Sequence, residues 1–388
     1  MAPYVWNEPL GLLRGFGGGV VIALATSVLL ALTGETAGIS GIVAGCLKAD
    51  TASWRYAFVI GLLMAGAILR AVPDPEDIYG PPLQLQWPYV VVGGVFVGFG
   101  TRLGNGCTSG HGVCGLSRIS VRSLLAVCSF MASGIVTAGV SRAPFSRDDA
   151  YDGGDLDPAS KADPPLELGE LYVVPLASVI TTSLLLMRLA TLVKSLSEES
   201  VQPPADTSFV GEAPESAPSA WDRAIGLSTV ILTGITFGLG LGLSGMCSPH
   251  KVLRFLDFLG DGGWDPQLGF VMGGAVAVNL VTFRLMAVQK GDTVPPLQRA
   301  LSKPENFGKS KPYSMIISYG YSCPENRKID WRLIIGAILF GSGWGLSGVC
   351  PGPAIVGFVS GEATFSLAVP SILFGMTIFH VATRLEIL

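Results

Sequence analysis

The chain has 388 residues, of which 49% are hydrophobic and only 14% are charged, and its mean hydropathy is +0.53. This composition is typical of a polytopic α-helical membrane protein, and it argues against two or three soluble domains. The apolar runs are continuous, whereas a transmembrane β-barrel needs alternating segments of about ten residues. The net charge of −4 gives no reason to expect a nucleic-acid partner.

Apolar runs long enough to cross a bilayer as helices recur along the whole chain. No cationic segment precedes the first run, so we expect it to be a retained span and not a cleaved signal peptide. Several runs are short and continue directly into glycine-rich sequence, which is typical of broken or re-entrant helices. We predict nine spans, at about 12–32, 54–72, 87–102, 120–141, 171–193, 223–240, 264–287, 331–343 and 366–386.

The spans divide into two halves joined by a polar linker. We expect an N-terminal half at 1–195, a linker at 196–222 and a C-terminal half at 223–388 with a long basic loop at 288–330. When the loops are assigned alternately to two faces, one face carries about twice as many Lys and Arg residues as the other. The positive-inside rule then predicts an external N-terminus and a cytoplasmic C-terminus.

Four glycine-rich phrases punctuate the spans, at 34–45, 98–115, 238–250 and 341–353. Each phrase lies between two spans, so the chain reads span–phrase–span four times. The unpaired fifth span inverts the second half relative to the first, which predicts an inverted-topology repeat with substrate sites near the bilayer midplane. The alternative is that the glycines only let helices pack closely.

Three of the phrases carry a cysteine in the same register, namely Cys107, Cys247 and Cys350. Serine, threonine or proline follows each of them, and these residues favour the first turn of a helix. A helix N-terminus presents unpaired amides and a partial positive charge, so inward-pointing N-termini from both faces could hold an anion without a basic side chain. The scarcity of Lys and Arg near Cys247 and Cys350 agrees with such a site.

A neutral thiol is a soft, weak hydrogen-bond donor, and three thiols in series could form a ladder along a pore. The pattern leaves the protonation state of the thiols open, because burial favours the thiol and helix N-termini favour the thiolate. We interpret Cys114 and Cys128 as small apolar filling residues. The predicted substrate-binding residues are Cys107, Cys247, Cys350, Gly106, Thr108, Ser109, His111, Ser244, Ser248, Ser347 and Gly41.

Two of the phrases also contain histidine, with Cys107 and His111 in one and Cys247 and His250 in the other. Two cysteines and two histidines could bind zinc or Cu(I), although the fourth phrase has no histidine. The other interpretation, which we prefer, is that the histidines line a vestibule or fix the loop. We therefore predict no metal site and no cofactor.

The phrases GCTSGHG (Gly106–Gly112), LSGMCSP (Leu243–Pro249) and LSGVCPG (Leu346–Gly352) resemble those of the YeeE/YedE sulfur-transport family. The resemblance implies a membrane protein that imports thiosulfate through an hourglass path pinched by broken helices. It further implies that Cys107, Cys247 and Cys350 touch the ion in turn, and that GISG (Gly38–Gly41) is the first phrase without its thiol. In bacterial relatives a small sulfurtransferase-like protein works alongside.

We therefore expect a transporter or channel for thiosulfate or a similar sulfur anion in the cell (inner or plasma) membrane, and not an enzyme. Two other functions remain open. One is a membrane sulfurtransferase that carries a persulfide on Cys107, and the other is a soft-metal transporter. The chain has no nucleotide-binding P-loop, which argues against direct drive by ATP. The sequence leaves the choice of sulfur anion and the choice between channel and coupled transport open.

Overall fold

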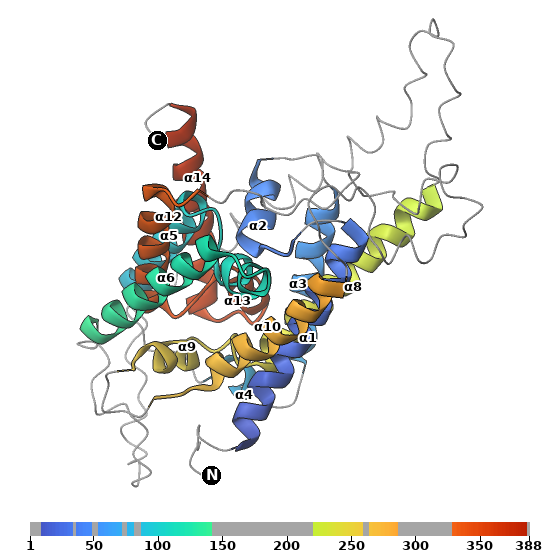
Figure 1. Ribbon diagram of the computed structural model, residues 1–388, viewed down its shortest axis with the longest axis horizontal. Coiled ribbons are helices and arrows are strands. Elements are labelled where there is room, and N and C mark those ends of the chain that lie inside the picture. The colour runs from blue at the N-terminus through green and yellow to red at the C-terminus, as the bar shows by residue number, and fades with distance from the viewer. Residues whose placement is uncertain are drawn as a thin grey trace, which may run out of the picture.

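A computed structural model describes residues 9–33, 36–48, 53–71, 76–80, 87–141, 220–258, 264–285 and 328–385. All regular structure in these residues is helical (Figure 1). Within them, seven helices are long and apolar enough to cross a membrane, or eight if the bent pair Trp87–Leu103 and Thr108–Gly115 counts as one span. The protein is a helical polytopic membrane protein.

Eight long helices lie where the sequence predicts spans. The fifth predicted span, at 171–193, falls outside the described residues, as do most of the linker at 196–222 and most of the basic loop at 288–330. The long helices are α1 (Pro9–Thr33), α3 (Ser53–Arg70), α5 (Trp87–Leu103), α6 (Val121–Val140), α8 (Ala220–Leu243), α10 (Gln267–Leu285), α12 (Trp331–Ser347) and α14 (Ala363–Arg384).

A short helix begins within each glycine-rich phrase, so the chain repeats a long–short–long unit four times. The short helices are α2 (Ile39–Leu47), the π-helix η1 (Thr108–Gly115), α9 (Pro249–Leu256) and α13 (Pro351–Phe358). Units one to four are therefore α1–α2–α3, α5–η1–α6, α8–α9–α10 and α12–α13–α14. A further turn of helix, α4 (Glu76–Tyr79), lies between units one and two.

The units associate in two pairs with the same pattern. In the first pair α1 packs on α8 and α10 while α3 packs on α8, and in the second α5 packs on α12 and α14 while α6 packs on α12. Unit one thus joins unit three, and unit two joins unit four. Figure 1 shows the second pair at the left of the bundle and the first pair at the right.

Glycine contacts fix the directions of the helices in the second pair. A Cβ added to Gly93 of α5 would lie 2.8 Å from the Cβ of Ser347, and one added to Gly104 would lie 3.3 Å from the amide nitrogen of Ala337. The contacts advance along α5 while they retreat along α12, so the first helices of units two and four are antiparallel. Such a glycine face lets two helix backbones approach closely, as in other membrane helix pairs.

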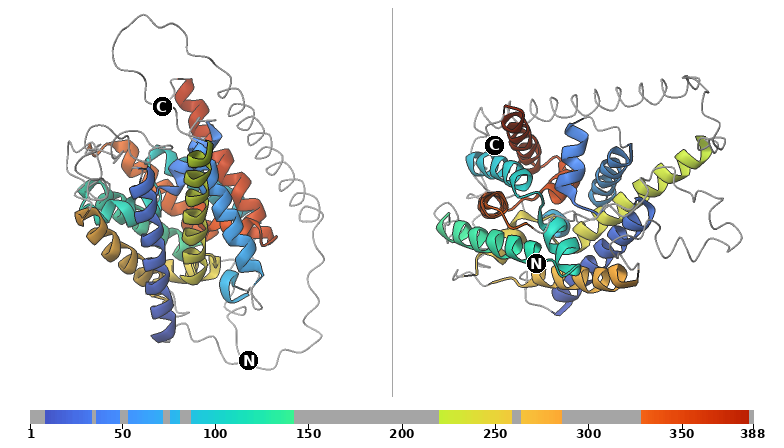
Figure 2. Two further views of the ribbon diagram at one scale, coloured as in Figure 1. Left: turned by 90° about the vertical axis from the view of Figure 1, so that its right-hand side faces the viewer. Right: turned by 45° about the horizontal axis from the view of Figure 1, so that its top comes forward.

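The first pair repeats these directions. A Cβ on Gly18 of α1 would meet the backbone of Ser244, while one on Gly240 of α8 would meet Ile22, so α1 and α8 are antiparallel. By contrast, α1 and α10 are parallel. Gly15 faces Gln267 near the start of both helices, and the hydroxyl of Ser27 hydrogen-bonds to that of Thr282 at 2.9 Å near their ends. Figure 2 shows that α1 begins at the opposite end of the bundle from the end of α14.

Candidate functional site

Three of the four breaks between a long and a short helix are tight turns that contain a residue in the left-handed conformation. Gly245 and Gly348 have φ values of +78° and +66°, and Asn105 has a φ of 56° in the second phrase. Glycine adopts this conformation without strain, and asparagine tolerates it better than most residues. The LSG sequence of the third and fourth phrases therefore ends the incoming helix at a defined point.

The N-cap residue of each short helix belongs to the glycine-rich phrase in which that helix begins. Cys107 and Cys350 occupy the N-cap positions of η1 and α13 in extended conformation, and neither makes a side-chain capping bond. Ser248 caps α9, since its hydroxyl accepts a hydrogen bond from the amide of Lys251 at 3.5 Å. Proline stands in the first turn of α9 and of α13, as predicted from the sequence.

The N-terminal ends of three short helices meet directly. The amide of Ile39, at the start of α2, donates a hydrogen bond to the hydroxyl of Ser109 at 3.1 Å. The hydroxyl of Thr108, at the start of η1, lies 3.9 Å from the sulfur of Cys350. A Cβ on Gly352, in the first turn of α13, would lie 3.8 Å from the side chain of Ile39.

The fourth short helix, α9, joins this meeting point through the third and fourth phrases. A Cβ on Gly348 would lie 2.7 Å from the carbonyl oxygen of Pro249, the first residue of α9. The thiol of Cys350 is also within electrostatic range of both Cys107 and Cys247. The first turns of all four short helices therefore converge, and their positive ends point toward one region.

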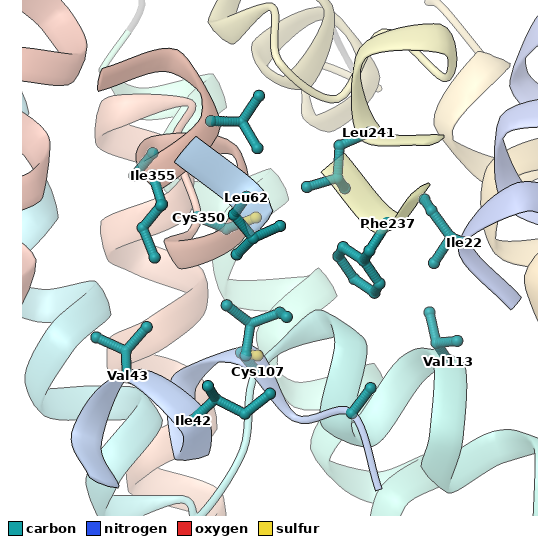
Figure 3. Packing of buried hydrophobic residues seen from close by; sticks show 14 of the residues in the cluster. Ile22, Ile42, Val43, Leu62, Cys107, Val113, Phe237, Leu241, Cys350 and Ile355 are labelled. Carbon is teal, nitrogen blue, oxygen red and sulfur yellow. The ribbon is translucent and has the colours of Figure 1, made fainter. Parts of the chain in front are cut away.

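The three predicted thiols lie inside this region and are closed off from solvent. The exposed fractions of Cys107, Cys247 and Cys350 are 2%, 0% and 3%. Cys107 contacts the hydroxyl of Ser109 at 3.2 Å. Figure 3 shows Cys107 and Cys350 among the apolar side chains of the cluster, which include Leu62 and Phe237. The described conformation is thus an occluded one at the cysteines.

The predicted serines of the third and fourth phrases occupy equivalent positions. Ser244 donates to the carbonyl of Leu241 at 2.9 Å, and Ser347 donates to that of Gly343 at 2.8 Å. Each hydroxyl also accepts a bond from the amide two residues later, at 3.4 Å and 3.3 Å. Both serines are fully buried. They stabilise the two turns, and their contacts are with the backbone of the turns themselves.

His111 and Gly106 pack against each other, whereas Gly41, the other predicted glycine, is exposed. The ring of His111 is buried, with its Nδ1 3.3 Å from the hydroxyl of Ser123 and its Nε2 3.2 Å from the carbonyl of Gly104. Gly106 packs against this ring. Because both ring nitrogens are engaged, the geometry favours the interpretation that His111 fixes the loop. Gly41 is exposed on α2, where a Cβ would meet no atom within 4 Å.

No three His, Cys, Asp or Glu side chains gather in a metal-binding group within the part of the chain that the structure describes. The second histidine, His250, lies in the first turn of α9. The imidazole there approaches Gly80, since a Cβ on that glycine would lie 3.7 Å from its Cδ2 atom.

Although Lys and Arg are scarce around Cys247 in the sequence, the basic side chain of Lys251 lies beside the turn that precedes Cys247. A Cβ on Gly245, two residues before Cys247, would lie 3.0 Å from the ammonium nitrogen of Lys251. The ammonium donates to the side-chain oxygen of Gln267 at 3.3 Å, and Gln267 donates to the carbonyl of Ser244 at 3.1 Å. Lys251 stands only four positions after Cys247, so its place in the sequence was a usable signal.

Basic side chains gather at the end of the bundle opposite to Lys251. Arg102 interacts electrostatically with Arg55, and His380 interacts with Lys48, Arg102 and Arg384. These residues come from the ends of α2, α5 and α14 and from the start of α3. The same end holds Arg122 at the start of α6, whose guanidinium donates to the carbonyl of Lys328 at 3.1 Å.

Two family models match the chain. A model described as sulphur transport matches residues 3–137, and a model described as a family of unknown function (DUF6691) matches residues 225–301 and 306–387. Each model covers two of the four long–short–long units.

Curated relatives include two proteins of Xylella fastidiosa (strain Temecula1), each called a probable transporter. One is 40% identical over 121 residues, which are 31% of this chain and 88% of the relative. The other is 36% identical over 151 residues, which are 39% of this chain and 86% of the relative. No solved structure matches the chain.

Proposed function

The chain belongs to the YeeE/YedE-like sulphur-transport family and is a membrane transporter, and on that premise we propose that it takes up thiosulfate or a closely similar sulfur anion. The observation that carries the proposal is the convergence of four short-helix N-termini around Cys107, Cys350 and Cys247. This arrangement suits a small anion, because helix N-termini offer unpaired amides and a partial positive charge.

The thiols supply the preference for sulfur in this proposal. Thiosulfate carries a soft terminal sulfur beside its hard oxygens, and a polarizable thiol suits the soft end. Cys350 is within electrostatic range of both other thiols, so the ion would pass from one of them to Cys350 and then to the other. The amides of the short helices would meanwhile contact the oxygens.

Passage requires a conformational change, since the three thiols are buried. The arrangement of the units in two pairs would allow such a conformational change. The first helices of paired units are antiparallel, as in an inverted-topology repeat. In such transporters one repeat moves against the other around a fixed central site. We propose that units one and two lie inverted in the membrane with respect to units three and four.

The charges at the helix ends support an orientation. The end of the bundle where α1 finishes and α12 starts carries most of the described basic residues, namely Lys48, Arg55, Arg102, Arg118, Arg122, Arg284, Lys328, Arg332 and Arg384. The other end carries Glu76, Asp257, Asp265 and Glu362 beside fewer basic residues. By the positive-inside rule the basic end is cytoplasmic, in the cell membrane, and the start of α1 is external.

Uptake of labelled thiosulfate into proteoliposomes tests the proposal. The wild-type protein should accumulate label, and excess unlabelled thiosulfate should suppress this more than sulfate does. Cys107→Ala, Cys247→Ala and Cys350→Ala should each reduce uptake at least tenfold. The matched control is Cys128→Ala, because Cys128 is an exposed cysteine on α6 away from the phrases. Normal uptake by all three phrase variants would rule out the thiol path.

A further inference from the structure

A buried polar cluster lies beside the third phrase, at the end of the bundle opposite the basic residues. It joins three elements: the turn after α8, the first turn of α9 and the start of α10. The backbone amide of Gln267 donates to Oδ1 of Asp265 at 2.9 Å. The side chain of Gln267 connects the ammonium of Lys251 to the carbonyl of Ser244, as described above. The cluster is therefore continuous from α10 to the turn that precedes Cys247.

Asp265 has an unusual environment for a carboxyl group. Its exposed fraction is 1%, and its second oxygen, Oδ2, is buried without a hydrogen-bond partner. A buried carboxylate oxygen without a partner is costly, whereas a protonated carboxyl avoids most of that cost. The pKa of Asp265 is accordingly raised, because burial outweighs the amide of Gln267 and the nearby charges of Lys251 and Arg254.

The charged and titratable groups around Asp265 come mainly from α9. Lys251 is 9% exposed and Arg254 is partly buried, and both interact electrostatically with the carboxyl. His250 lies on the same helix and Asp257 is its C-cap residue, while Arg14 lies exposed on α1, which packs on the start of α10. Positive charge thus predominates in the described surroundings of Asp265.

We propose that Lys251 and Asp265 form an additional binding subsite for the sulfur anion, beside the turn that precedes Cys247, in which Asp265 carries a proton while the anion is bound. This inference rests on the proposed function. The ammonium of Lys251 supplies the attraction for the anion. An ionised Asp265 offsets that charge and repels the anion, and a proton on Oδ2 removes the repulsion.

Proton binding and anion binding therefore favour each other. By linkage, the affinity for the anion falls as pH rises above the pKa of Asp265, by up to about tenfold per pH unit for one proton. Binding of the anion in that range takes up a proton from solution. If the end of the bundle with Asp265 is external, an acidic exterior promotes capture.

The experiment is titration of the purified protein with thiosulfate by calorimetry, at several pH values and in buffers of different ionisation enthalpy. The wild-type protein should bind more weakly as pH rises and should take up a proton on binding. Asp265→Asn keeps an acceptor for the amide of Gln267 but cannot ionise. It should retain tight binding at every pH, with no proton uptake. Lys251→Gln should weaken binding at least tenfold at low pH.

The start of α12 offers matched controls. Asp330 caps this helix through the amide of Leu333 at 3.0 Å and is exposed, and Arg332 is exposed in its first turn. Asp330→Asn and Arg332→Gln should leave the affinity and its pH dependence as in the wild-type protein. A pH dependence that persists unchanged in Asp265→Asn overturns the subsite.

Two further outcomes separate this inference from the proposed function. If the wild-type protein binds thiosulfate with no pH dependence and no proton uptake, the subsite is wrong and the proposed cargo stands. If the wild-type protein binds no thiosulfate, the proposed cargo itself fails.

Should Asp265→Asn not fold, the variant Lys251→Gln tests the proposal in its place. Removing the ammonium raises the pKa of the carboxyl, so the midpoint of the pH profile must move to higher pH, and an unmoved midpoint contradicts the proposal.

Discussion

The hydroxyl of Thr108 lies 3.9 Å from the sulfur of Cys350, although the two residues are 242 positions apart in the chain. Thr108 belongs to the first turn of η1 and Cys350 caps α13, so this contact joins the positive ends of two short helices. One of these helices comes from unit two and the other from unit four. The contact therefore lies where the two halves of the chain meet.

Thr108→Val should reduce thiosulfate uptake without changing the fold, because valine keeps the shape of threonine and removes its hydroxyl. A hydrogen bond contributes about 1 kcal/mol net, so we expect uptake to fall by about fivefold. The measurement is the initial rate in proteoliposomes. The control is Thr377→Val, which removes an exposed hydroxyl that bonds only within α14. Equal rates for both variants would contradict a role for Thr108 at the site.

Gly98→Ala should destabilise the protein, because its Cβ would collide with the carbonyl oxygen of Ile372 on α14. Overpacking of this kind costs about 1–3 kcal/mol. Thermal unfolding in detergent measures the effect as a lower unfolding temperature. Gly139→Ala is the control in α6, where an added Cβ meets nothing within 4 Å. That variant should be as stable as the wild-type protein or more so, since alanine favours helix.

Ser248→Ala and Asp330→Ala should have similar effects on stability but different effects on transport. Each removes a side-chain cap, from α9 and from α12 respectively, at a cost of about 1 kcal/mol. Only Ser248 lies where the short helices converge, so only its variant should slow thiosulfate uptake. Unfolding curves and uptake rates, measured on the same preparations, check both statements. A matching loss of uptake in Asp330→Ala would attribute the effect to stability alone.

Asp265→Asn should stabilise the folded protein at neutral pH. The folded state raises the pKa of this carboxyl above its ordinary value of about 3.9, so the folded protein holds the proton more tightly than the unfolded chain. Stability is therefore lost as pH rises from that ordinary value through the folded pKa, and it stays lower above that range. Asparagine avoids the loss. Unfolding temperatures of both proteins should differ at pH 7 and converge below about pH 4.

The long helices could be predicted from the sequence because bilayer thickness and hydropathy determine them. The predicted span at 120–141 coincides with α6 (Val121–Val140), and that at 331–343 lies within α12 (Trp331–Ser347). The short helices were also foreseeable, since serine and proline after the phrases mark helix starts. The π-helical form of η1 was not, because it depends on packing that local sequence does not encode.

The contacts between phrases could be predicted only in part. Repetition of a cysteine in register grouped Cys107, Cys247 and Cys350, and the structure brings them into one region. For the predicted binding residue Gly41, the structure shows only that an added Cβ would meet no atom within 4 Å. The approach of Lys251 to Gly245 was missed, because the side chain turns back from α9 over the preceding turn.

The central claim is that a sulfur anion passes among the three buried thiols where the short helices converge. Diffraction at the selenium edge from crystals that contain selenosulfate, a selenium analogue of thiosulfate, locates the ion directly. We predict an anomalous peak in contact with the sulfur of Cys350 and with Cys107 or Cys247, and its loss in crystals of Cys350→Ala. A peak only among Lys48, Arg55 and Arg102, with the thiol region empty, would contradict the account.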